Sequence, residues 1–290
     1  MNAMEEQLNI QWFPGHMTKA RRMIGENLKL VDAICEILDA RIPLSSRNPD
    51  LDALVGGKPR LVILNRADQA DPAVTRLWTE EYARMGMPAL LTDCKSGKGV
   101  NRFPVALRGL LREKIARYAE KGQTGRPLRA MIVGIPNVGK SSFINRIAGR
   151  KAAEASDRPG VTRGKQWIKI EQGLELLDTP GILWPRFESR AVGERLAFTG
   201  AVRDQILDRE ALAARLLECL RDAYPAAISE RYKLEIKPED TGRSLLETAA
   251  RKRGFLLSGG VCDLERMAVI LLDEFRGGKL GRISLERPEV

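Results

Sequence analysis

The residues from 134 to 141 have the types and the spacing of a phosphate-binding loop. They read GIPNVGKS, which is the pattern G-x-x-x-x-G-K-S. The two glycines let the backbone approach a polyphosphate closely, because a Cβ atom would obstruct it. Lys140 would supply positive charge to the outer phosphates, and the Ser141 hydroxyl would ligate Mg²⁺. The alternative is a chance glycine-rich turn before a helix.

The neighbouring residues predict the strand and the helix that such a loop needs. Residues 128–133 form an apolar run, and residues 142–148 read as a helix. Backbone N–H groups of the loop and of the first helical turn would then face the phosphates. The predicted phosphate-binding residues are Asn137, Val138, Gly139, Lys140, Ser141 and Ser142.

A second polar group follows another predicted strand, at residues 61–64, and would bind the base. It consists of Asn65, Arg66, Ala67 and Asp68. The Asp68 carboxylate could accept both hydrogen-bond donors on the edge of guanine, whereas adenine would turn a lone pair toward it. A buried polar group left unpaired costs about 1–3 kcal/mol, and more when it is charged. The predicted base site also includes Cys94, through its backbone N–H, and Lys95.

Three further residues have the chemistry of a γ-phosphate sensor. Thr162 could give Mg²⁺ a second hydroxyl ligand, and Asp178 could hold a water bound to the ion. The N–H of Gly181, which ends the run DTPG, could detect the γ-phosphate. Loops that the γ-phosphate orders and that relax after hydrolysis are the switches of GTPases. Many GTPases orient the attacking water with a Gln at the next position, which is Ile182 here.

Short strands and helices alternate along the first part of the chain. Further strands are predicted over residues 31–38, 88–91, 166–170 and 174–177, and helices over 17–30, 71–85 and 100–120. This alternation predicts an α/β fold, with a mostly parallel sheet that helices cover on both faces.

The strand signal fades after about residue 185. Three later segments, 209–224, 243–253 and 261–275, read as helices with apolar faces. We therefore predict two domains: an α/β domain over residues 1–185, and an all-helical domain over residues 186–290.

The positive charge of the chain is concentrated in the first predicted domain. The net charge is +10; residues 1–185 hold 29 Lys and Arg against 20 Asp and Glu, and residues 186–290 hold 19 against 18. Ten basic side chains but only Glu113 and Glu120 lie between positions 95 and 129. Such a basic stripe is typical of contact with a phosphate backbone, so we predict RNA binding. A solvated helix face followed by a linker is the alternative.

Other features exclude several classes of protein. No run approaches the roughly 18 apolar residues of a membrane helix, so we expect no membrane partner. The first 11 residues include Glu5 and Glu6 and do not resemble an export signal. The four cysteines (35, 94, 219 and 262) form no CxxC pair, which favours free thiols and argues against zinc. We expect a cytoplasmic protein that is a monomer in solution.

The motifs resemble those of translation-factor-related GTPases, but their order is rotated. The base-binding elements, 65–68 and 93–95, precede the phosphate loop, as in circularly permuted GTPases. With the runs QWFPGHM at 11–17 and DARIP at 39–43, the chain resembles the ribosome biogenesis GTPase A (YlqF-like) family, strongly over residues 10 to 200 and more loosely over the helical tail.

This resemblance implies a circularly permuted P-loop GTPase fold with a C-terminal helical domain. It also implies a GTPase that uses GTP/GDP and Mg²⁺, and that binds the assembling large ribosomal subunit and its ribosomal RNA. Such a protein acts late in maturation and is released after hydrolysis. The basic stripe would contribute salt-sensitive RNA contacts.

The resemblance extends to the two groups that would complete catalysis. It implies that His16 places the attacking water, since Ile182 cannot do so, and that Lys140 stabilises the transferring phosphate. A surface or capping histidine is the alternative for His16. The resemblance also implies a K⁺ ion near Asn137. Two residues depart from the family pattern. Arg66 replaces the usual Lys, and its stem and flat guanidinium can still cover the base, so we expect altered affinity rather than lost specificity. Asp93 replaces the usual Ser or Asn, which bears on how its loop is supported.

Two readings from other classes remain open. A P-loop kinase or ATPase would share the phosphate loop, but Asp68 argues against it. An RNA-binding assembly factor in which hydrolysis is incidental would share the basic stripe. Within the family, action on the small subunit or in an organelle is a third alternative.

Overall fold

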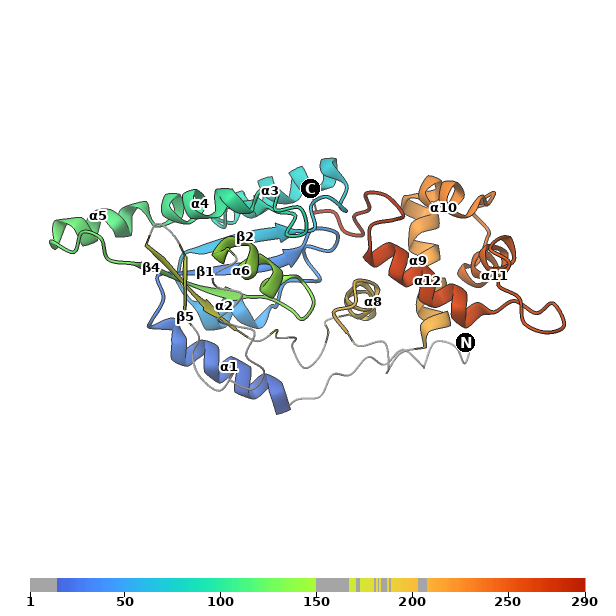
Figure 1. Cartoon of the computed structure of the whole chain (residues 1–290), viewed down its shortest axis with the longest axis horizontal. Coiled ribbons are helices and arrows are strands. Elements are labelled where there is room, and N and C mark those ends of the chain that lie inside the picture. Colours follow the sequence, from blue (N-terminus) through green and yellow to red (C-terminus); the bar gives the residue numbers. More distant parts are fainter. Residues whose placement is uncertain are drawn as a thin grey trace. The chain divides into compact units, whose positions relative to one another are not determined.

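The structure of the chain is a computed structural model, shown in Figure 1. It describes residues 15–149, 167–170, 173–179, 189–202 and 208–289, together with positions 181, 183 and 187. These residues form two compact units. The first contains the described residues up to position 183 and also residues 286–289; the second contains the described residues between 187 and 285.

The described residues of the first unit contain a six-stranded sheet. Its strands are β1 (Ala33–Asp39), β2 (Arg60–Asn65), β3 (Ala89–Leu91), β4 (Leu128–Val133), β5 (Trp167–Ile170) and β6 (Leu174–Asp178). Their order is β3-β2-β1-β4-β6-β5, and each neighbouring pair is parallel except β5 and β6. The prediction of a mostly parallel sheet is therefore confirmed.

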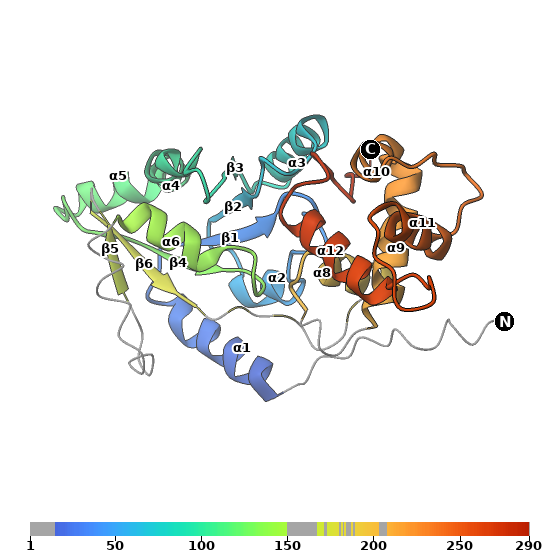
Figure 2. The same cartoon turned by 45° about the vertical axis from the view of Figure 1, so that its right-hand side comes forward.

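Helices cover both faces of this sheet (Figures 1 and 2). The helices are α1 (Gly15–Leu28), α2 (Asp50–Val55), α3 (Pro72–Arg84), α4 (Phe103–Leu110), α5 (Arg112–Glu120) and α6 (Lys140–Ala148). On one face, Ile24 of α1 and Leu51 of α2 pack with Met131 of β4. Elsewhere, Phe103 of α4 meets Phe143 of α6 edge to face, with ring centroids 5.1 Å apart. Because both faces are covered, every residue of β1 and β2 is buried.

Local signals predicted most of these elements, with two differences. The predicted long helix over residues 100–120 is a 3₁₀ turn (Val100–Arg102) followed by α4 and α5, which are separated at Leu111. The short helix α2 was not predicted, since six residues are too few for a clear period. By contrast, Asp71 caps α3 as expected, and its carboxylate accepts the N–H of Ala73 at 2.8 Å.

The second unit is helical in the residues that the structure describes. It consists of α8 (Arg190–Phe198), α9 (Arg209–Ala223), α10 (Pro225–Tyr232), α11 (Gly242–Lys252) and α12 (Leu264–Arg276). The apolar side of α9 is fully buried against the other helices (Figure 2). The short helices α8 and α10 were not predicted. Among the described helices, none is both long enough and apolar enough to span a membrane.

The C-terminal residues correct the predicted domain limits. Residues 286–289 were assigned to the helical domain, but they belong to the first unit. The buried Glu286 carboxylate accepts the N–H of Leu44 at 2.7 Å and both the N–H and the hydroxyl of Ser45. The indole N–H of Trp78 donates to the Glu286 carbonyl at 3.1 Å. These bonds join residues more than 200 positions apart, so no local pattern predicts them.

Candidate nucleotide-binding site

The predicted phosphate loop lies between β4 and α6, as its sequence requires. Gly134 has φ +151°, and a Cβ atom there would lie 2.5 Å from the carbonyl oxygen of Ile37. Gly139 has φ +106°, and its Cβ would lie 2.3 Å from Nδ2 of Asn65. Both positions therefore require glycine for steric and conformational reasons. The predicted Ser141 and Ser142 are exposed at the start of α6.

Lys140 is the buried cation of this loop. Its Nζ donates to the carbonyl oxygens of Gly134 at 3.0 Å and Ile135 at 2.7 Å. Burial lowers the pKa of Lys140 to about 8, although the Asp178 carboxylate acts in the opposite direction. Burial also raises the pKa of Asp178, and Lys140 counteracts part of that rise. The two predicted residues thus share one partly buried site and depend on each other for charge balance.

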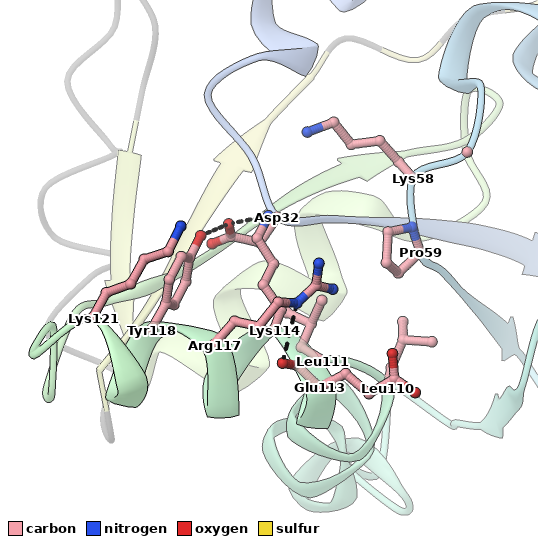
Figure 3. Close-up of a pocket in the computed structure, with 11 residues that line it drawn as sticks. Asp32, Lys58, Pro59, Leu110, Leu111, Glu113, Lys114, Arg117, Tyr118 and Lys121 are labelled. Atoms are coloured by element: carbon pink, nitrogen blue, oxygen red, sulfur yellow. Dashed lines mark hydrogen bonds and ion pairs between the residues drawn. The ribbon is translucent and has the colours of Figure 1, made fainter.

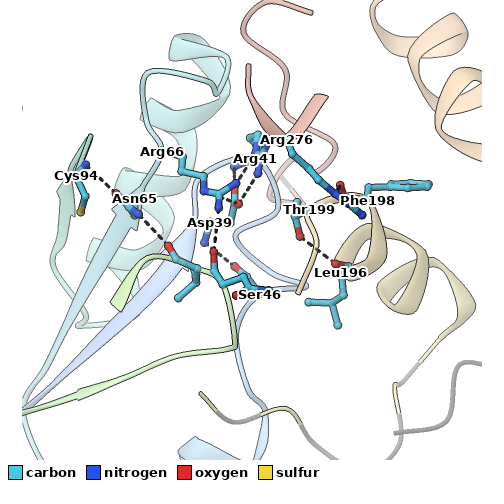
Figure 4. Close-up of polar contacts among 12 residues, drawn as sticks. Asp39, Arg41, Ser46, Asn65, Arg66, Cys94, Leu196, Phe198, Thr199 and Arg276 are labelled. Atoms are coloured by element: carbon cyan, nitrogen blue, oxygen red, sulfur yellow. Dashed lines mark hydrogen bonds and ion pairs between the residues drawn. The ribbon is translucent and has the colours of Figure 1, made fainter. Parts of the chain in front are cut away.

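Asn65 connects the predicted base site to the phosphate loop (Figure 4). Its Nδ2 donates to the Val138 carbonyl at 2.8 Å, and its Oδ1 accepts the Cys94 N–H at 3.2 Å and the Thr92 hydroxyl at 3.3 Å. Asn65 is buried, so these bonds are not exposed to competition from water. The Cys94 N–H was predicted to meet guanine, but here it donates to Asn65. A guanine contact would have to share or replace that bond.

Arg66, the next residue, also contacts the phosphate loop. Its guanidinium donates to the Asn137 carbonyl at 2.9 Å, and its Nε lies 3.8 Å from Oδ2 of Asp39. Asp39 in turn forms a buried ion pair with Arg41, at 2.8 Å (Figure 4). Although burial acts to raise it, the pKa of Asp39 is lowered, because the Arg41 and Arg66 guanidiniums stabilise the carboxylate. The DARIP run therefore stabilises the base-binding segment through the contact between Asp39 and Arg66.

The remaining members of the base site lie at the same edge of the sheet. Asp68 is exposed there, and the Ala67 N–H donates to the Thr92 carbonyl at 3.1 Å. The Lys95 N–H donates to the Asp93 carboxylate at 2.8 Å. The Asp93 carboxylate thus supports the backbone of this loop.

One positioning residue was missed by sequence reasoning. Arg146, in the last turn of α6, donates from Nε to the Cys94 carbonyl at 3.2 Å and from its other guanidinium nitrogen to the Lys95 carbonyl. It therefore fixes the base-site loop onto the helix that begins at the phosphate loop. Nothing in the local sequence marks it, because basic residues are common in the last turn of a helix.

The predicted switch residue Gly181 lies against the phosphate loop. A Cβ atom on Gly181 would approach Cα of Pro136 to 2.8 Å and Nζ of Lys140 to 2.9 Å. Just before it, the Thr179 hydroxyl donates to the Ile132 carbonyl at 2.6 Å, which fastens the end of β6 to β4. Close backbone packing explains why the position needs glycine.

Three predicted positions are only partly covered by the structure or not at all. Thr162 and Ile182 lie outside the described residues. His16 lies in the first turn of α1, rather than before the helix as predicted, because α1 begins at Gly15. Its side chain is outside the described part of the chain.

The described residues contain no group of three or more His, Cys, Asp or Glu that could hold a metal ion. A site in which hydroxyl and phosphate oxygens hold Mg²⁺ would not need such a group. The C-terminal ends of β2, β3, β4 and β6 bring four features together. These are the glycine-lined phosphate loop, the buried Lys140, the half-buried Asp178 carboxylate and the exposed Asp68 carboxylate. This is the arrangement that can bind a polyphosphate and a base at the same sheet edge.

Comparison with known proteins agrees with this geometry. A family model described as "50S ribosome-binding GTPase" matches residues 129–235. The Ribosome biogenesis GTPase A of Priestia megaterium is 48% identical over 282 residues, which cover 97% of this chain and 98% of that protein. The corresponding protein of Bacillus cereus is 47% identical and covers 97% of this chain and 94% of its own length.

A solved structure is also similar over nearly the whole chain. The crystal structure of GNP-bound YlqF from T. maritima has a TM-score of 0.67 and 30% sequence identity, and it covers 93% of this chain and 99% of its own. The predicted fold and its rotated motif order are therefore confirmed. The chain belongs to the ribosome biogenesis GTPase A family, and it is a GTP-hydrolysing enzyme with a function in ribosome biogenesis.

Proposed function

We propose that this GTPase binds the assembling large ribosomal subunit in its GTP state, acts late in maturation and leaves after hydrolysis. The description of the matching family model, which names the 50S ribosome, supports this choice of partner. The basic stripe at 95–129 supports contact with ribosomal RNA. We further propose that it does so as a monomer in the cytoplasm.

We propose the following roles for the site residues. Residues 137–142 would bind the phosphates, Asp68 would bind guanine, and Lys140 would exchange its two carbonyl partners for phosphate oxygens. Ser141 and Thr162 would ligate Mg²⁺, and Asp178 would hold a water of that ion. When bound, Mg²⁺ would neutralise charge on the β- and γ-phosphates. The Lys140 ammonium inside the loop, and the start of α6 directly after it, support the fit of a phosphate group close to the backbone.

The observation that carries the switch role is the contact of Gly181 with the phosphate loop. A γ-phosphate would lie near Lys140, and the Gly181 backbone is close to its Nζ. Beyond Gly181 the chain continues to α8, which begins at Arg190 in the helical unit. Movement of Gly181 on hydrolysis would therefore act on the start of that unit.

Sedimentation with large ribosomal subunits tests this function. The wild-type chain should pellet with the subunits in a non-hydrolysable GTP analogue and stay in the supernatant in GDP. A variant that binds GTP without hydrolysing it should remain on the particle. Equal pelleting in both nucleotides would favour the alternative, an RNA-binding factor in which hydrolysis is incidental. Pelleting with small subunits alone would contradict the proposed partner.

We propose that His16 orients the attacking water, because Ile182 cannot. Replacing His16 by Ala should lower particle-stimulated GTP hydrolysis on the order of a hundredfold, which is within the range for a general acid–base group. GDP affinity should stay unchanged. A His16→Ala chain with the full stimulated rate would show that another group performs this step.

We propose that Asn137 helps to bind K⁺ beside the phosphates. Its φ of +58° and the bond from Arg66 to its carbonyl hold it in the loop. Hydrolysis should then be several-fold faster in potassium than in sodium buffer at equal ionic strength, roughly the effect of one added charge contact. Equal rates in the two buffers would rule out this ion.

The lowered pKa of Lys140 predicts that nucleotide affinity depends on pH. The ligand-free lysine loses its proton as the pH rises through about 8, whereas bound phosphates would keep it protonated. Affinity for GDP should therefore fall about three- to fourfold between pH 7 and pH 8.5. Fluorescence titration across this range measures the slope. A Lys140→Arg chain, which stays charged, should show no such slope, and a flat wild-type curve would contradict the assignment.

A further inference from the structure

A cavity lies at the N-terminal ends of β1 and β2, whereas the nucleotide site lies at the C-terminal ends of the strands. The cavity has a volume of about 530 Å³, and its polar and aromatic lining comes from Asp32, Lys58, Lys114, Arg117, Tyr118 and Lys121 (Figure 3). Asp32 immediately precedes β1 and Lys58 closely precedes β2, whereas Asn65 ends β2. Strand β2 runs from Arg60 to Asn65, so the rise of a strand places its two ends about 16 Å apart. The cavity beside α5 is therefore separate from the nucleotide site.

The lining of this α5 cavity is positively charged. Its lining includes four cations (Lys58, Lys114, Arg117 and Lys121) and two carboxylates (Asp32 and Glu113). The Asp32 carboxylate already accepts hydrogen bonds from the Tyr118 hydroxyl at 2.8 Å, Lys114 Nζ at 2.7 Å and the Arg129 N–H at 2.9 Å. Its charge is therefore largely compensated, and it repels an incoming anion only weakly.

The folded chain holds two of these ammonium groups near each other. Partial burial and the charge of Lys114 both lower the pKa of Lys58, with only Asp32 opposing them. Lys58 Nζ is fixed by a bond of 2.6 Å to the Val31 carbonyl. An anion in the cavity would relieve this repulsion.

Helix α5 carries three of the cations on one side. Lys114, Arg117 and Lys121 are spaced i, i+3 and i+7, with Lys121 at the C-terminal cap. No residue of α5 is buried, so the helix contributes little to the core. From Lys114 to Lys121 the helix rises about 10 Å, more than one phosphate group needs.

The basic surface continues on the other side of Tyr118. A second cavity of about 350 Å³ is lined by Tyr118 together with Arg108, Arg126 and Gln123. The Arg126 guanidinium stacks on the Tyr118 ring, 4.6 Å from its centroid. The two cavities share Tyr118 and place basic side chains on both sides of it. Such a spread of charge suits an extended polyanion better than a single small ion.

We propose that the α5 cavity binds phosphate groups of an RNA backbone. Lys58, Lys114, Arg117 and Lys121 are the ligands, and Tyr118 lines both this cavity and the second one. The inference rests on the proposed ribosomal function for the identity of the RNA. The proposal adds an RNA contact site on the first unit, at the N-terminal ends of the strands and away from the nucleotide site.

The test compares two double variants of the full chain. Arg117→Gln/Lys121→Gln removes two cations of the α5 cavity, and Arg76→Gln/Arg84→Gln removes the same charge from exposed positions on α3. Binding of a short fluorescein-labelled single-stranded RNA, of about 20 nucleotides, is followed by anisotropy at several salt concentrations. The cavity variant should bind about tenfold more weakly, with a salt slope smaller by about 1.4, whereas the α3 variant should bind as the wild type does. Basal GTP hydrolysis and melting temperature should be unchanged in both.

Equal RNA affinity of the two variants would overturn the proposal. Inorganic phosphate is the second probe: if the cavity variant loses phosphate binding but keeps RNA binding, the cavity takes a free anion and the proposal is wrong. Purified large subunits are the third probe. If the wild type binds the RNA through this cavity but not the subunits, the proposed function fails while the cavity assignment stands.

Discussion

Replacing Asp68 by Asn is expected to abolish the preference of this chain for guanine nucleotides. The carboxylate is exposed at the end of β2, beside the loop that Asn65 and Arg146 hold in place. An amide cannot accept both donors of guanine, because one of its two atoms is itself a donor. Loss of such a paired contact lowers affinity on the order of a hundredfold or more. Xanthine, which has an oxygen in place of the guanine amino group, should gain affinity.

Competition against labelled GDP measures this exchange. Unlabelled GDP, XDP and ADP are titrated against the wild type, Asp68→Asn and Glu80→Gln, an equivalent loss of charge at an exposed position on α3. XDP should become the strongest competitor only for Asp68→Asn. If this variant retains wild-type GDP affinity, the base is bound elsewhere.

Replacing Gly181 by Ala is expected to stop hydrolysis while nucleotide binding survives. The added Cβ would lie 2.8 Å from Cα of Pro136, which is backbone and cannot give way as a flexible side chain can. The segment that contains Gly181 must therefore move away from the phosphate loop, and its N–H would no longer reach a γ-phosphate. Single-turnover hydrolysis should fall on the order of a hundredfold or more, as for the loss of a transition-state donor.

GDP affinity separates this effect from general damage to the site. Because GDP has no γ-phosphate, Gly181→Ala should bind it within a few-fold of the wild type. Gly173→Ala is the matched control: it makes the same change at φ +71° in the turn before β6, where a Cβ would meet nothing within 4 Å. That variant should lose some stability but hydrolyse GTP normally. Normal hydrolysis by Gly181→Ala would disprove the sensor role.

The sequence could predict those parts of the fold that depend on neighbouring residues. The strands read as apolar runs because they are buried on both faces, and the phosphate loop has fixed spacing because each glycine has a steric reason. The break between α4 and α5 was missed because Leu111 fits either a helix or a turn. The helices α8 and α10 were missed because their apolar faces are short.

The contacts that join the site could not be predicted in the same way. Asn65 bonds to residues 29 and 73 positions away, and Arg146 to residues 51 and 52 positions away. Only the mostly parallel sheet, with its strand order β3-β2-β1-β4-β6-β5, brings these segments to one end of the strands. Arg66 shows the same limit: its side chain was predicted to cover the base, and its bond to the Asn137 carbonyl of the phosphate loop could not be predicted.

Direct titration of the wild-type chain with guanine and adenine nucleotides tests the central claim, which is that elements preceding the phosphate loop build a guanine-specific site beside it. Calorimetry with GDP and ADP, in magnesium buffer at neutral pH, gives both dissociation constants without a variant. The account predicts that GDP binds at least about a hundredfold more tightly than ADP. Equal dissociation constants, or no binding of GDP, would contradict it.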